Sequence, residues 1–137
     1  MYRDCKLFMS DSRKTVMICD DEADLLQLFR YTLELTYDVL VADSGKECIE
    51  KFLEEKRKGK KVDVLLLDYK LGDMMGDIVA CKIHEINGVK TILISAYELE
   101  QTMIDHLTDC GCIKGILRKP IRMPVMMKEV QKALSAN

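Results

Sequence analysis

Five short apolar runs, each followed by a stretch of helical periodicity, restrict the fold of this chain more than any other feature. The runs cover residues 15–19, 37–42, 62–67, 91–94 and 115–118. Apolar residues at helical spacing follow them, as in the groups Leu25, Leu26, Phe29 and Leu33, and Ile78, Val79, Ile83 and Ile86. This alternation predicts an α/β fold with a parallel sheet, covered by helices on both sides and joined by right-handed crossovers.

The length and charge of the chain limit the number of domains and the kinds of partner. Its 137 residues suit one domain, and since residues 1–13 lack periodicity we expect an N-terminal tail before a domain over residues 14–137. A net charge of -2 gives no support for binding nucleic acid or an anionic membrane surface. The basic run at residues 56–61 is typical of a solvated helix end. No apolar segment approaches the ~18 residues of a membrane span, and no signal peptide is expected.

The six cysteines do not form a convincing metal site. Cys19, Cys48 and Cys81 lie in apolar patterns, where cysteine acts as a small hydrophobic residue. Cys110 and Cys112 are separated by one residue, a narrower spacing than in the usual half of a zinc site. We therefore expect free thiols, which favour a reducing, cytoplasmic location.

Charged and polar side chains follow four of the five runs. Asp20 and Asp21 come after the first, Asp68 after the third, Ser95 after the fourth and Lys119 after the fifth. Ligands of open α/β sheets bind beyond the carboxyl ends of the strands, so these side chains are expected to meet if the first and third strands are neighbours. Carboxylates that meet raise one another's pKa unless a cation joins them, and oxygen ligands suit Mg²⁺ or Mn²⁺. A metal, an ammonium group and a hydroxyl around one carboxylate describe a site for accepting a phosphoryl group.

The chain resembles the receiver domain of two-component response regulators over about residues 14–134. The resemblance rests on motifs in order, which are Asp20-Asp21, residues 42–47 (ADSGKE), Asp68 followed by Gly76, Ser95-Ala96 and Lys119-Pro120. It implies a flavodoxin-like (βα)5 three-layer sandwich with a parallel five-stranded sheet of order 2-1-3-4-5. The resemblance further implies a cytoplasmic phosphoprotein of a phosphorelay that is not an enzyme in its own right.

The resemblance also implies which residues accept the phosphoryl group and hold the metal. Asp68 would take the group from the phosphohistidine of a sensor histidine kinase or a phosphotransfer protein. Mg²⁺ (or Mn²⁺) would be bound by Asp20, Asp21, Asp68 and the backbone carbonyl of Lys70.

Two further residues would respond to the phosphoryl group. Ser95 would be the switch hydroxyl, and Lys119 would pair first with Asp68 and then with the phosphoryl group, next to a cis peptide bond to Pro120. The fourth helix, fifth strand and fifth helix would form the face for an unknown downstream target or a second copy in a homodimer.

Several positions depart from the family's common pattern. Gly72 replaces a frequent proline, Ile116 a frequent aromatic residue and Ser95 the commoner threonine. The isoleucine keeps a second interpretation open, in which the domain is a protein-interaction module that works without phosphorylation. Lys70 and Tyr97 are long side chains near Asp68, and our hypothesis is that they hinder the attacking water and prolong the phosphorylated state.

Two other classes with related features fit the residues less well. A phosphatase of the haloacid dehalogenase type uses a second acid two residues after its nucleophile, where this chain has Lys70. A flavin carrier of the flavodoxin type needs a hydroxyl-rich phosphate loop after the first strand, where Asp20, Asp21 and Glu22 would repel a phosphate.

Overall fold

The structure is a computed structural model that describes residues 13–135. Strands and helices alternate along these residues: β1 Thr15–Cys19, α2 Ala23–Glu34, β2 Asp38–Ala42, α3 Gly45–Arg57, β3 Val64–Asp68, α4 Gly76–Ile86, β4 Lys90–Ser95, α5 Gln101–Asp109, β5 Gly115–Arg118 and α6 Met123–Ser135. Of the predicted tail only Arg13 is described, and its guanidinium donates hydrogen bonds to the carbonyls of Glu34 and Tyr37. The other residues of that tail lie outside the described part of the chain.

The strands form one parallel sheet in the order β2-β1-β3-β4-β5, which confirms the predicted topology. In the register of the sheet, Cys19 at the end of β1 lies beside Leu67 of β3 and Ala42 of β2. The chain runs to one side of β1 to form β2 and to the other side to form β3. The carboxyl ends of β1 and β3 therefore flank the point where the order reverses, which is the usual ligand position in such sheets.

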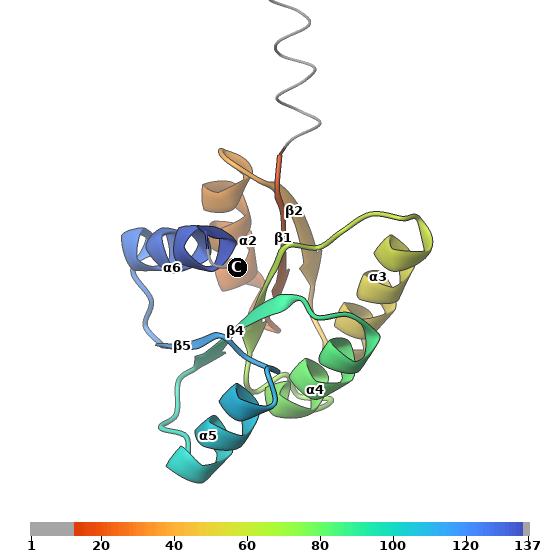
Figure 1. The fold of residues 1–137 in the computed structure, drawn as a ribbon. Coiled ribbons are helices and arrows are strands. Elements are labelled where there is room, and N and C mark those ends of the chain that lie inside the picture. The colour runs from red at the N-terminus through yellow and green to blue at the C-terminus, as the bar shows by residue number, and fades with distance from the viewer. Residues whose placement is uncertain (1–12, 136–137) are drawn as a thin grey trace, which may run out of the picture.

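Helices cover both faces of the sheet, as the ribbon drawing shows (Figure 1). On one face α2 and α6 pack against Val16 and Ile18 of β1, with Phe29 and Met126 fully buried between the layers. On the other face α3, α4 and α5 pack against alternate strand residues such as Met17 and Leu65. All five residues of β3 are buried, as expected of a central strand covered on both sides.

The buried face of α4 differs in one position from the predicted pattern. Ile78 is 46% exposed, although it is one of the apolar residues whose spacing predicted this helix. Val79, Ala80 and Ile83 form that face instead. Ile78 lies outside this face, on the solvent side of the helix.

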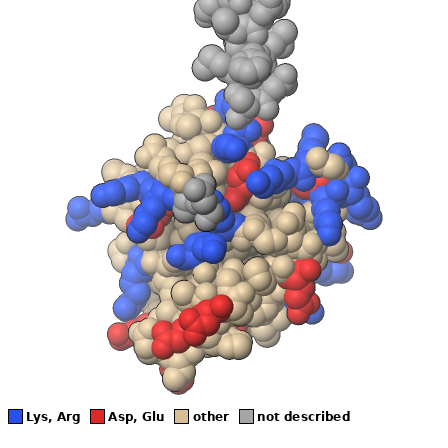
Figure 2. Space-filling model, in the orientation of Figure 1, with Lys and Arg blue, Asp and Glu red and all other residues tan. Residues whose placement is uncertain are grey.

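The basic run after α3 is a solvated helix end, as predicted. Lysine and arginine side chains gather at the upper right of the space-filling view, where α3 ends in the ribbon (Figure 2). Within the run, Lys58 pairs with Glu54 at 3.3 Å and with Glu55 at 3.6 Å. Over residues 13–135, no helix is both long and apolar enough to cross a membrane.

The cysteines divide into two groups. Cys19 and Cys48 are buried in the core and Cys81 is half-buried, all three as free thiols, which agrees with their prediction as small hydrophobic residues. Cys110 and Cys112 are joined by a disulfide, so the expectation of free thiols is wrong for this pair. Gly111 has a φ of 82°, and the turn that it makes brings the two Cα atoms to 5.5 Å.

Candidate functional site

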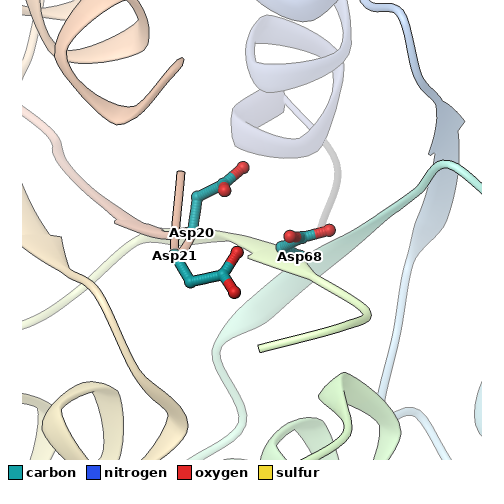
Figure 3. A group of neighbouring side chains, drawn as sticks. All are labelled: Asp20, Asp21 and Asp68. Carbon is teal, nitrogen blue, oxygen red and sulfur yellow. The ribbon is translucent and has the colours of Figure 1, made fainter. Parts of the chain in front are cut away.

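Three carboxylates meet at the carboxyl edge of the sheet. Asp68 is the last residue of β3, and Asp20 and Asp21 follow directly after β1, the neighbouring strand. One oxygen of each carboxylate lies within 4.8 Å of an oxygen of the other two. Figure 3 shows the three side chains side by side at the ends of their strands. The predicted convergence of these acids is therefore present in the structure.

The two buried acids of this cluster have raised pKa values. Burial raises the pKa of Asp68 to about 6, the nearby Asp20 adds to the increase, and Lys119 opposes it. Burial likewise raises the pKa of Asp20, against the backbone N–H of Glu22, which donates to its Oδ1 at 2.9 Å. A carboxylate at this position is thus costly to ionise without a positive partner.

Lys119 reaches into the cluster from the end of β5. Its Nζ lies 3.2 Å from Asp20 Oδ2 and 3.3 Å from Asp68 Oδ2, and the side chain is mostly buried. It also donates a hydrogen bond of 3.4 Å to Glu22. Burial alone would lower the pKa of Lys119, but Asp20 and Asp68 raise it overall, so the ammonium stays charged. Glu22 follows Asp20 and Asp21 in the sequence, but no contact with Lys119 was predicted for it, because an exposed acid at the start of a helix is common.

The cluster fits a divalent oxygen-binding metal. Asp20 Oδ2 is fully buried and, although close to the ammonium, receives no hydrogen bond from any residue that the structure describes. Asp21 is exposed, so water reaches this side of the cluster. Carboxylates that leave room for several waters are the donors that Mg²⁺ prefers.

Ser95 and two long side chains complete the surroundings of Asp68. Ser95, Lys70 and Tyr97 line a cavity of about 280 Å³ at Asp68. The other lining residues are Asp21, Glu22, Tyr69, Gly72, Ala96 and Lys119. The Ser95 hydroxyl donates to the carbonyl of Tyr97 at 2.7 Å and accepts from its N–H at 3.0 Å. The hydroxyl is therefore engaged in its own turn and would have to rotate to reach a group on Asp68.

The loop after β3 is held by a residue that the motifs did not reveal. Asp73 accepts hydrogen bonds of 2.9 Å from the backbone N–H groups of Gly45 and Lys46, at the start of α3. The N–H of Gly45 and then that of Lys46 lower the pKa of Asp73. Gly72 has a φ of 82°, which proline cannot adopt, so the departure at this position goes with a different loop conformation.

Comparison with known proteins decides the family. The profile of the response regulator receiver domain matches residues 16–131. The chain belongs to this family. A receiver domain protein (CheY-like) from Methanospirillum hungatei JF-1 has a similar structure, with a TM-score of 0.79 and 23% sequence identity over 90% of this chain and 94% of that one.

A second solved structure agrees on the fold of this receiver domain. A two-component response regulator from Clostridium difficile matches with a TM-score of 0.77 and 20% identity, over 89% of this chain and 96% of the other. The Lys119–Pro120 peptide is cis, as the resemblance implied. Ile116 is half-buried and packs against the core, at the position where the family often has an aromatic side chain.

Proposed function

We propose that this receiver domain takes a phosphoryl group onto Asp68, with Mg²⁺ (or Mn²⁺) bound by Asp20, Asp21, Asp68 and the backbone carbonyl of Lys70. The observation that carries the proposal is the meeting of three carboxylates with one buried ammonium at the switch point of the sheet. Asp68 is the acceptor in this proposal because it ends the central strand β3, lies beside Asp20 and Asp21, and is 3.3 Å from the Lys119 ammonium. The domain is then an acceptor of phosphoryl groups and not a catalyst with its own substrate turnover.

Each residue has a separate part in this reaction. A carboxylate oxygen of Asp68 attacks the phosphorus of the donor, and the bond from phosphorus to the donor breaks. Bound Mg²⁺ would supply positive charge for the oxygens of the transferring group. Lys119 can exchange its contact with Asp68 for one with a phosphoryl oxygen, since Asp20 keeps it in place. Ser95 can then leave the carbonyl of Tyr97 and donate to the same group.

The partners follow from this chemistry and are part of the proposal. The donor is the phosphohistidine of a sensor kinase or phosphotransfer protein in the cytoplasm. The output is a change in the face formed by α5, β5 and α6, called the α5-β5-α6 face below, which docks a target protein or a second copy of the chain. We do not propose binding to nucleic acid or to membranes, because the chain has a net charge of -2.

Incubation with acetyl phosphate, followed by intact mass spectrometry, tests the proposed function. We expect the gain of one phosphoryl group when Mg²⁺ is present, and little gain with excess chelator. Asp68→Asn should abolish the gain, because an amide oxygen is a poor nucleophile. Asp43→Asn is the matched control, since this exposed acid follows β2 on the same edge of the sheet but lies outside the cluster.

A different result would favour the second interpretation. If neither acetyl phosphate nor phosphoramidate adds a group to the wild type with Mg²⁺, the domain is better described as an interaction module that works without phosphorylation. The observation that favours this interpretation is Ile116 on β5, at the position where the family often has an aromatic residue.

We also propose that Lys70 and Tyr97 prolong the phosphorylated state. The Lys70 ammonium lies 5.2 Å from the centre of the Tyr97 ring, and both residues line the cavity at Asp68. This pair would hinder water from approaching the phosphoryl group on the open side of the cavity. The double substitution Lys70→Ala and Tyr97→Ala should speed loss of the group by up to about tenfold, or ~1.4 kcal/mol of barrier.

The lifetime is measured by removing the donor and following the intact mass with time. Tyr97→Phe is the control, because it keeps the ring beneath the ammonium and should leave the rate close to that of the wild type. An unchanged rate in the double variant would contradict the shielding role.

A further inference from the structure

Cys110 and Cys112 are placed for thiol–disulfide chemistry by the turn between α5 and β5. Cysteines whose Cα atoms lie 5.5 Å apart are within the usual range for a disulfide, and these two are joined by one. An extended chain would separate residues i and i+2 further than this. Gly111 shortens the separation through its φ of 82°, in the left-handed region that favours glycine.

Backbone hydrogen bonds hold this turn independently of the sulfur atoms. The carbonyl of Leu107 accepts from the N–H of Cys112 at 2.9 Å and from that of Ile113 at 3.2 Å. The carbonyl of Thr108 accepts from the N–H of Gly111 at 3.1 Å. The two cysteines are therefore expected to stay close when they are reduced, so the pair is already arranged for closure.

The bond between them is poorly suited to a purely structural role. A disulfide stabilises mainly by restricting the unfolded chain, and the effect grows with the length of the loop that it closes. The loop closed here has one residue between the cysteines. Cys110 is an exposed residue and Cys112 a buried one, so an external thiol or disulfide approaches Cys110 more readily than Cys112.

We propose that Cys110 and Cys112 form a reversible dithiol–disulfide site that reacts with low-molecular-weight disulfides and thiols. In oxidation, the thiolate of Cys110 attacks a disulfide RSSR, forms a mixed disulfide and releases one RSH after protonation. The thiolate of Cys112 then attacks the Cys110 sulfur and displaces the second RSH. Two protein thiols and one RSSR thus become one intrachain disulfide and two RSH. In reduction, an external thiol attacks Cys110 and frees Cys112.

This site lies beside the α5-β5-α6 face, because its turn joins α5 to β5. The proposal does not depend on phosphorylation of Asp68, which lies at the end of another strand. Its test contains no phosphoryl donor, so a failure of one proposal would leave the other unaffected.

Peptide mass spectrometry after exposure to oxidised glutathione tests the site. Trypsin releases residues 91–114 as one peptide that contains Cys110 and Cys112 and no other cysteine. The reduced chain is treated with oxidised glutathione, quenched with acid, unfolded and alkylated with N-ethylmaleimide. We expect this peptide to escape alkylation and to be lighter by two hydrogen atoms than its reduced form. Cys81 is an internal comparison, because its burial, with Asp77 and Glu85, raises the pKa of its thiol. Cys81 should therefore react with oxidised glutathione at least about tenfold more slowly than the Cys110–Cys112 pair.

Two single variants separate the roles of the two sulfurs. Cys112→Ser should accumulate glutathione on Cys110, because the second thiol that would displace it is gone. Cys110→Ser should be alkylated at Cys112 and carry little glutathione, since Cys112 is buried. The proposal is overturned if the wild-type peptide is alkylated to the same extent as Cys81. It is also overturned if the wild type accumulates as much glutathione as Cys112→Ser.

Discussion

At about pH 8 and without a divalent cation, Asp68→Asn is expected to raise the free energy of unfolding by about 2 kcal/mol. Burial raises the pKa of Asp68 from 3.8 to about 6 in the folded chain. A raised pKa means that the folded state favours the protonated form of Asp68. The stability that this protonated acid contributes is therefore complete below about pH 4 and is lost as the pH rises through about 6. Complete loss of this contribution would lower the free energy of unfolding of the wild type by about 3 kcal/mol.

The neutral amide of the Asp68→Asn variant does not ionise, so it avoids this loss of stability. Lys119 still has acidic partners in the variant. After the substitution, Lys119 keeps its contacts with Asp20 at 3.2 Å and Glu22 at 3.4 Å. The amide has nearly the shape of the acid, so no cavity is created. The burial that makes the Asp68 carboxylate costly to the fold also means that a bound cation would stabilise it.

Urea unfolding of both proteins across pH measures the effect. The difference between variant and wild type should shrink as the pH falls from about 8 toward about 4. Mg²⁺ should stabilise the wild type more than the variant, because the variant offers one carboxylate fewer. A variant that is less stable than the wild type at about pH 8 would show that the ion pair with Lys119 outweighs the burial of the charge.

Most of the fold and the centre of the site could be predicted from the sequence, because both depend on local patterns. Strand β5 was predicted with its observed bounds. Asp20 and Asp21 follow β1 and Asp68 ends β3, and the neighbours of both strands are fixed by the topology. The predicted bounds of β3 ended at Leu67, since a charged residue closes an apolar run, whereas the strand includes Asp68.

The features that were missed depend on contacts between distant segments or on fine geometry. Asp73 binds N–H groups of α3, 27 and 28 residues away, and nothing in its own neighbourhood marks it as a tether. The pairing of Cys110 with Cys112 depends on the φ of Gly111, which a spacing rule for metal ligands does not consider. Ile78 belongs to an apolar pattern that continues past the edge of the buried face.

Gly76→Ala is expected to destabilise the chain by about 3 kcal/mol or more, because overpacking here meets backbone that cannot move aside. A methyl group at position 76 would lie 2.6 Å from the carbonyl oxygen of Asp68 and 2.7 Å from the Cα of Tyr69. Gly76 is the first residue of α4, so the close approach of this helix to the end of β3 depends on the missing side chain. Alanine's better helix propensity, worth about 1 kcal/mol, does not offset such a clash.

The matched control is Gly88→Ala, and the comparison also bears on function. A methyl group at position 88 meets nothing within 4 Å, so this variant should be neutral or more stable by up to about 1 kcal/mol. Urea midpoints give the stabilities, and acetyl phosphate labelling of the folded fraction reports on Asp68. Because the clash involves the backbone of Asp68 itself, folded Gly76→Ala should also label more slowly than Gly88→Ala. Equal stability of the two variants would mean that α4 can shift away from β3, and equal labelling would mean that the acceptor is insensitive to that shift. If Gly76→Ala is less stable and also labels more slowly than Gly88→Ala, the glycine at position 76 is a steric requirement of the site and not only of the helix.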